Sequence, residues 1–163
     1  MAKSGIDRAE IFLTTKVWIS NAGERRAAAS IDVSLKKLRT DYIDLLLIHQ
    51  PFGDYYGTYR AMESALAAGK VRAIGVSNFR PDRFIDLTQN VLVKPAVNQL
   101  EVNVFSQQNE SREVHKETDT ERALHRWDSV SLSSKASWRS PNPRRSNLRR
   151  WLAISCFVGS VTS

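Results

Sequence analysis

The feature that most constrains how this chain can fold is a regular alternation of short apolar segments with longer amphipathic ones. The apolar or β-branched segments are residues 11–15, 43–48, 71–76 and 96–103. The amphipathic segments, whose apolar side chains recur at helical spacing, are residues 24–39, 59–69 and 81–90. The apolar segments recur about every 25 to 30 residues, the length of a strand with its crossover helix. Because such crossovers are right-handed and join parallel strands, the sequence predicts an α/β fold with about four parallel β/α units.

A polar residue ends or follows each apolar segment. These residues are Lys16, His49, the pair Ser77 and Asn78, and Gln99. The carboxyl ends of parallel strands meet at one edge of a sheet, where ligands bind in α/β folds. Taken alone, each residue has an ordinary explanation as a solvated, structural or helix-capping side chain. Together, at the same end of successive strands, they predict a binding site at that edge.

The sequence changes character after about residue 110. Residues 1–110 hold 14 Lys and Arg against 12 Asp and Glu, whereas residues 111–163 hold 10 against 5. Most of the net charge of +7 therefore lies in the second part, which is rich in Ser and Arg and has no sustained period. We predict a folded part at 1–110 and an irregular basic tail at 111–163. We expect this tail to be disordered or translated out of frame, with local helix at most over 112–127.

The composition also limits where such a chain works. A single cysteine, Cys156, excludes an internal disulfide and favours a reducing compartment. The first residues include no apolar secretory segment, and the apolar stretch at 151–158 is too short to span a bilayer. We therefore expect a cytoplasmic protein with no membrane partner. The spacing of His115, His125 and Cys156 matches no zinc pattern, so we expect no metal site.

Four segments of the chain resemble the aldo-keto reductases in order and spacing. They are TKVW at 15–18, LLLIHQP at 45–51, the stretch from Met62 that ends in GKVRAIGVSNF at 69–79, and PAVNQLE at 95–101. The resemblance covers about residues 5–110 and is greatest to the diketogluconate-reductase and prostaglandin F synthase-like branch. It implies strands three to six of a (β/α)8 TIM barrel. It also implies NADPH binding at the strand ends and the reduction of small carbonyl substrates to alcohols by hydride transfer.

The resemblance further implies roles for the polar residues. Lys16 matches the family's catalytic lysine, whose charge lowers the pKa of a tyrosine proton donor. His49 matches the catalytic histidine, which orients the carbonyl group and donates a hydrogen bond to its oxygen. Trp18 would form a wall of the substrate pocket, or else pack as an aromatic side chain at the barrel rim.

Ser77, Asn78 and Gln99 match residues that hold the nicotinamide carboxamide in this family. The family's first two and last two strands have no counterpart here. Its aspartate, its tyrosine, the aromatic residue that stacks on the nicotinamide and the basic residues that grip the 2′-phosphate are therefore missing as well. Tyr55 and Tyr56 are predicted in the loop after His49, at the correct edge for a replacement proton donor, but nothing in the sequence supports such a role.

A partial barrel also leaves backbone groups without partners. We expect unpaired edges at 11–15 and 96–103 and inward side chains that face water. Residues 1–110 should then be marginally stable, aggregate, or associate with a second copy.

Three functions follow. The first is a fragment of an NADPH-dependent aldo-keto reductase. The second is an inactive half barrel that acts through assembly with another copy. The third is a basic tail that binds nucleic acid or an acidic surface.

Overall fold

A computed structural model describes residues 7–101, residue 114 and residues 121–125 of the 163-residue chain. The elements are η1 (Arg8–Glu10), β1 (Thr14–Val17), η2 (Ile19–Asn21), α1 (Glu24–Leu38), β2 (Leu45–Ile48), α2 (Tyr55–Ala67), β3 (Ile74–Ser77), α3 (Pro81–Gln89), β4 (Val97–Glu101) and β5 (Glu121–His125). The five strands form one parallel sheet in the order of the sequence. The predicted α/β fold is confirmed, with strands alternating with helices as in part of a TIM barrel.

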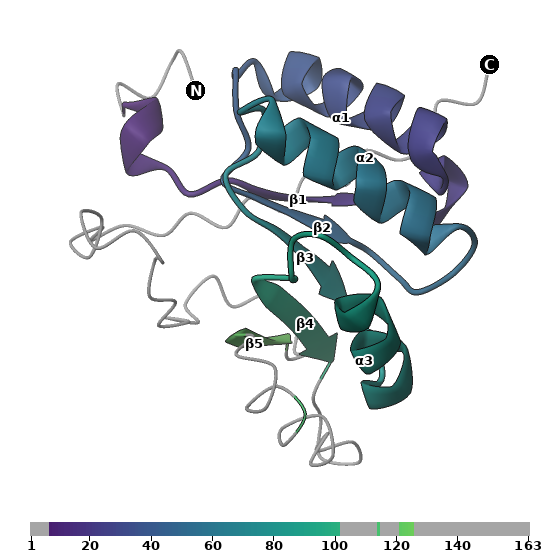
Figure 1. The fold of residues 1–163 in the computed structure, drawn as a ribbon. Helices are drawn as coiled ribbons and strands as arrows, with labels where there is room; N and C mark the ends of the chain where they lie inside the picture. Colours follow the sequence, from purple (N-terminus) through teal and green to yellow (C-terminus); the bar gives the residue numbers. More distant parts are fainter. Residues whose placement is uncertain (1–6, 102–113, 115–120, 126–163) are drawn as a thin grey trace.

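The helices cover one face of this sheet. Helices α1 and α2 lie side by side across it, and α3 lies near β3 and β4 (Figure 1). Their apolar faces form one core with the strand residues that point toward them, including the fully buried Ile31, Tyr59 and Phe84. Burial of large side chains of this kind contributes about 1.5 to 3 kcal/mol each.

Local signals account for the ends of the helices. The Asp54 carboxylate accepts a hydrogen bond from the Gly57 N–H (2.7 Å) and caps α2. Pro81 is at the first position of α3, where its missing N–H costs nothing. Gly69, predicted as the stop signal after α2, has a φ of +73°, a conformation that glycine adopts without strain.

The first strand differs from its prediction. The apolar segment at 11–15 was expected to end at Lys16, whereas β1 begins at Thr14 and includes Lys16. Lysine does not end the strand because the side chain of Lys16 lies along the sheet face opposite the helices. The N–H groups of Asp44 and Leu45 both donate to the carbonyl oxygen of Leu13 (3.1 Å each), just before β1 begins.

Three further expectations are wrong. Residues 121–125 form a strand, not the helical or irregular chain expected there, and β5 pairs with β4 along its length. The edge predicted at 96–103 is therefore covered by β5. The sequence did not indicate this because strand pairing is made by backbone N–H and C=O groups, which every residue type but proline carries, and needs no apolar period. The inward side chains of Leu45, Leu47 and Val97 are buried and do not face water. The rest of 102–163, apart from Val114, lies outside the described residues.

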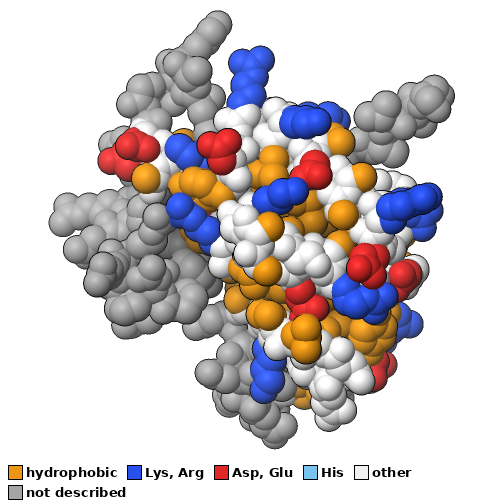
Figure 2. Space-filling model, turned by 45° about the horizontal axis from the view of Figure 1, so that its top comes forward, with side chains coloured by type: hydrophobic (Ala, Val, Ile, Leu, Met, Phe, Trp, Pro, Cys, Tyr) orange, Lys and Arg blue, Asp and Glu red, His pale blue; other side chains and the backbone are white. Residues whose placement is uncertain are grey.

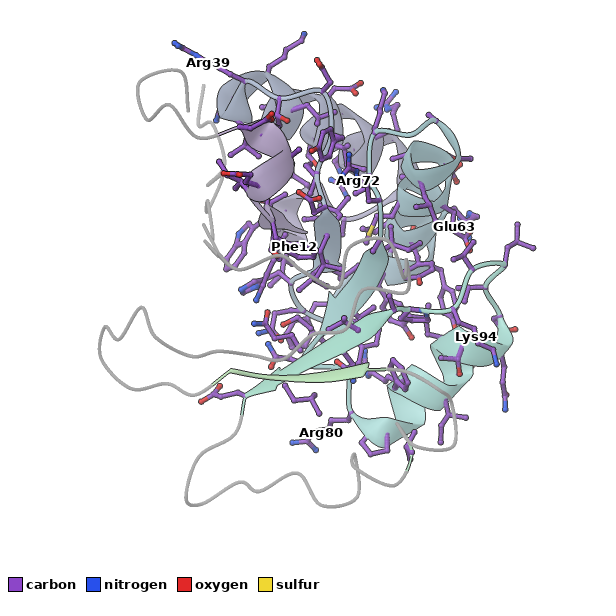
Figure 3. The ribbon with its side chains drawn as sticks, turned by 90° about the vertical axis from the view of Figure 1, so that its left-hand side faces the viewer. Phe12, Arg39, Glu63, Arg72, Arg80 and Lys94 are labelled. Carbon is purple, nitrogen blue, oxygen red and sulfur yellow. The ribbon has the colours of Figure 1, made fainter. Side chains whose placement is uncertain are left out.

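A side chain from α2 holds the loop before β4. One oxygen of the Glu63 carboxylate accepts hydrogen bonds from the N–H groups of Leu92 and Val93, both at 2.9 Å. Figure 3 shows Glu63 on the side of the molecule where this loop, marked by Lys94, precedes β4. The Tyr59 hydroxyl donates to the Val93 carbonyl oxygen from the same helix (3.0 Å). These hydrogen bonds hold the loop that precedes β4 against α2.

The charged surface of the described part is mixed. On the face shown in Figure 2, Lys and Arg side chains are distributed among acidic and apolar ones and form no single patch. Among the described helices, none has both the length and the apolar character needed to cross a bilayer.

Candidate active site

Strand register brings the predicted residues to one edge of the sheet. Lys16 pairs with Leu47, and Leu47 pairs with Gly75, so the three lie in one row across the sheet. Successive residues of a strand alternate between the two faces, so His49 and Ser77 lie on the same face one layer nearer the carboxyl ends. Gln99 is the registered partner of Ser77 on β4. The structure therefore places an amine, an imidazole, a hydroxyl and an amide on four consecutive strands.

Lys16 lies one layer nearer the amino ends of the strands than His49, Ser77 and Gln99. Its side chain extends toward the carboxyl ends. Its ammonium Nζ donates a hydrogen bond to Ser77 Oγ at 3.4 Å. Among the residues that the structure describes, no carboxylate oxygen lies within ion-pair distance of this nitrogen. Partial burial without a counter-charge disfavours the charged form, so burial lowers the pKa of Lys16.

His49 follows directly on β2 and contacts Trp18. The His49 backbone N–H donates to the Val17 carbonyl oxygen (3.1 Å), which continues the ladder past the end of the strands. The Trp18 and His49 rings are 4.5 Å apart between centroids, at an interplanar angle of 47°. Burial, together with the positive charge of Lys16, lowers the pKa of His49, which favours neutral imidazole at physiological pH.

The turn after β3 is held in an unusual conformation. Asn78 has a φ of +62°, in the left-handed region, and its N–H donates to the Gln99 carbonyl oxygen at 2.9 Å. Asparagine tolerates this region better than most residues. Ser77 is buried, and Gln99 Oε1 is a buried oxygen without a hydrogen-bond partner among the described residues. An acceptor of this kind costs free energy unless a ligand donor reaches it.

Two supporting residues were not identified from the sequence. A Cβ at Gly75 would lie 2.5 Å from the Val97 carbonyl oxygen, so only glycine lets β3 and β4 approach this closely. Asn98 is buried, and its Nδ2 donates to the Phe79 carbonyl oxygen at 3.0 Å, which ties the turn after β3 to β4. The interrupted apolar run around Gly75 is a signal that could have indicated the close approach. Nothing local distinguishes Asn98 from a surface residue.

The tyrosines do not lie where the sequence suggested. All four are described, and Tyr55 and Tyr56 belong to α2 instead of the loop after His49. The helix begins this early because Asp54 caps it. The Tyr56 hydroxyl donates to Asp86, and burial, with this hydrogen bond, raises the pKa of Tyr56 well above its ordinary range. In the described part of the chain, Lys16 forms no hydrogen bond with a tyrosine and no cluster of three or more His, Cys, Asp and Glu could hold a metal ion.

Comparison with known proteins gives one consistent result. The sequence model of the Aldo/keto reductase family matches residues 1–122. The chain is 37% identical over 135 residues to the 9,11-endoperoxide prostaglandin H2 reductase of Trypanosoma cruzi, covering 82% of this chain and 47% of that protein. This agrees with the branch that the sequence motifs predicted.

Solved structures agree with the family match. An aldo/keto reductase from Brucella melitensis aligns with a TM-score of 0.72 and 43% identity, over 74% of this chain and 48% of its own. A Bombyx mori aldo-keto reductase, solved in complex with NADP, aligns with a TM-score of 0.71 and 33% identity, over 76% and 44%. The chain spans less than half the length of the curated relatives that it matches.

Proposed function

This chain belongs to the aldo/keto reductase family, and on that premise we propose that it binds NADPH and reduces aldehydes or ketones to alcohols. The observation that carries the proposal is the hydrogen bond between Lys16 Nζ and Ser77 Oγ, with His49 and Gln99 on the strands beside them. These groups come from four consecutive strands and meet at the edge where ligands bind in such folds. A small carbonyl compound needs donors of this kind at its oxygen and an apolar wall around the rest.

The residues present fit the nicotinamide end of the cofactor. Its carboxamide has one acceptor oxygen and two N–H donors, which complement a serine hydroxyl and two side-chain amides. Gln99 Oε1 is the buried acceptor that lacks a described partner, and Ser77 and Asn78 lie beside it on β3. We propose that these three residues hold the carboxamide and so determine which ring face meets the substrate. The Bombyx mori relative was solved in complex with NADP, which supports a cofactor of this class for the present chain.

NADPH, when bound, supplies the hydride. The side chains of this chain would donate a hydrogen bond and a proton to the carbonyl oxygen of the substrate. A ring N–H of His49 would donate a hydrogen bond to that oxygen and stabilise its developing negative charge. Lys16 Nζ would deliver the proton that completes the alcohol, since no described tyrosine is hydrogen-bonded to it. Its lowered pKa makes its ammonium a stronger acid than that of a solvated lysine. Trp18, packed on the His49 ring, would exclude water from one side of the carbonyl group.

NADPH titration followed by a turnover assay tests the proposal. Binding should change the fluorescence of NADPH, and an aromatic aldehyde should then cause loss of its near-ultraviolet absorbance. Gln99→Ala and Ser77→Ala should each weaken binding by about twofold to tenfold, the effect of one lost hydrogen bond. Lys16→Met should lower kcat more than it raises the Kd for NADPH. Ser64→Ala, on an exposed turn of α2, is the control and should change neither.

The absence of any NADPH fluorescence change at millimolar concentration would contradict the proposal. Binding that is indifferent to both Gln99→Ala and Ser77→Ala would also contradict it, because the cofactor would then lie elsewhere.

A further inference from the structure

The amine of Lys16 differs from the other described lysines. Lys70 Nζ is ion-paired with Asp32 at 2.7 Å, and Lys36, Lys37 and Lys94 are exposed to water. Lys16 Nζ is partly buried, and within the described residues its hydrogen-bond partner is the neutral hydroxyl of Ser77. An amine without a carboxylate gains little from being charged, and partial burial removes the water that would stabilise the charge.

The neighbouring His49 gives Lys16 no counter-charge. Burial and the positive charge of Lys16 both lower the pKa of His49, so its imidazole favours the neutral form. Lysines activated as nucleophiles are desolvated or placed next to another cationic group, and Lys16 meets the first of these conditions. Ser77 Oγ, 3.4 Å away, accepts a hydrogen bond from Nζ, so the lone pair of a neutral amine would be directed away from Ser77.

We propose that Lys16 is a nucleophile that condenses reversibly with small aldehydes and ketones to form an imine at Nζ. The Nζ lone pair attacks the carbonyl carbon, a C–N bond forms, and the carbonyl oxygen is protonated to the hydroxyl of a carbinolamine. The C–O bond then breaks, and the oxygen leaves as water with two hydrogens that Nζ carried as a neutral amine. The nitrogen lone pair closes the C=N bond, and no oxidant or reductant is consumed.

The remaining side chains assist this step. A ring N–H of His49 can donate a hydrogen bond to the departing hydroxyl, as it would to the carbonyl oxygen in reduction. The Trp18 ring, 4.5 Å from the His49 ring, gives the organic part of the carbonyl compound an apolar surface. The condensation needs neither NADPH nor hydride transfer, so it is independent of the proposed reductase activity.

Reductive trapping tests the proposal on the full 163-residue chain without NADPH. The chain is incubated near neutral pH with limiting 4-nitrobenzaldehyde and cyanoborohydride, which fixes an imine as a stable secondary amine. Peptide mass spectrometry then gives the labelling rate at each lysine. Lys16 should be labelled faster than Lys36 or Lys37 by about fivefold or more. The preference should disappear in urea, where all lysines are solvated.

Two variants give matched comparisons. Lys16→Arg keeps the positive charge and should remove the label from this site, whereas Lys36→Arg should leave the Lys16 label unchanged. Equal or slower labelling of Lys16 in the wild-type chain would overturn the proposal, and that comparison requires no variant to fold. If Lys16 is not labelled faster but NADPH still binds, the imine proposal alone is rejected. If Lys16 is labelled faster but NADPH does not bind, the reductase proposal alone is rejected.

Discussion

His49 and Lys16 each hold a basic nitrogen where water is partly excluded. The two lie on neighbouring strands, and no described carboxylate within ion-pair distance of Lys16 compensates its charge. Both groups therefore favour their neutral forms more than they would in water. At the scale of the residue, both proposed roles of Lys16 rest on this shared preference, because it makes the Lys16 ammonium a better acid and the free amine more available.

The histidine makes stability depend on pH. The folded chain holds His49 at a pKa below its ordinary value of 6.5, so between the two values the unfolded chain binds more protons. The contribution of His49 to the free energy of unfolding should therefore be at its full value above pH 6.5 and should decrease as the pH falls through the lowered pKa. Urea unfolding of the wild type and His49→Gln at several pH values measures the slope. The variant should have the shallower slope in this range, and identical slopes would contradict the prediction.

At the scale of elements, the distance between β3 and β4 determines the position of the groups that we propose hold the cofactor. Ser77 and Gln99 are register partners, and Gly75, two residues earlier, allows their strands to meet. A bulkier residue at 75 would separate the strands one layer below the site. The close approach thus links backbone packing to the position of Gln99 Oε1.

Gly75→Ala tests this link. Its new methyl group would lie 2.5 Å from the Val97 carbonyl oxygen and 2.9 Å from Leu47 Cδ2, too close for either contact. We expect a loss of about 1–3 kcal/mol in the free energy of unfolding, typical of an overpacked interior. Urea denaturation followed by circular dichroism measures it. The control Ala29→Ser, at an exposed position of α1, should stay within about 0.5 kcal/mol; equal losses in the two variants would show that Gly75 is not tightly packed.

At the scale of the whole molecule, the candidate site and a buried charged cluster lie at opposite ends of the strands. At the amino end, the buried Asp44 carboxylate accepts hydrogen bonds from Arg8 Nη2 (2.7 Å), Arg72 Nη1 (3.3 Å) and the Leu13 N–H (3.0 Å). The two guanidinium groups lie 4.0 and 3.6 Å from the centroid of the Tyr42 ring. This cluster joins the start of the described chain to β2 and to the segment before β3.

Asp44→Asn tests how much the charged cluster at the amino ends of the strands contributes to the free energy of unfolding. The variant keeps an acceptor for the Leu13 N–H but removes the negative charge that pairs with Arg8. The side chains of this ion pair are largely buried. We expect a loss of about 2 kcal/mol in the free energy of unfolding, the scale of a hydrogen bond to a charged group. The exposed Asp41→Asn should lose less than about 0.5 kcal/mol. Equal unfolding midpoints for the two variants would contradict the assignment.

The sheet edges bear on assembly. Pairing with β5 covers β4, so in the described part of the sheet the outer strands are β1 and β5, and only the edge predicted at the first strand still stands. Association with a second copy remains a prediction, and so does the division of the chain at residue 110. A nucleic-acid role would depend on the basic tail, which lies almost entirely outside the described residues.

Several positions show where sequence reasoning succeeded. The spacing of the apolar segments, and the polar residues that end them, predicted that Lys16, His49, Ser77 and Gln99 would lie at one edge, because parallel strands place equivalent ends together. The roles of these residues stay predictions. The same reasoning misplaced Tyr55 and Tyr56 in a loop and extended the first strand too early, because a cap such as Asp54 and the start of a ladder depend on neighbours that periodicity does not contain.

By itself, the sequence determined the alternation of strands and helices, their approximate bounds and the edge of the sheet at which the polar residues lie. These properties follow from local spacing and from the burial of apolar side chains. Only the tertiary structure decided that 121–125 pairs with β4, that Asn78 adopts a positive φ, and that Lys16 reaches Ser77 from one layer below. Each of these depends on register between segments far apart in the chain, and a hydrogen bond across that distance leaves no local pattern in the sequence.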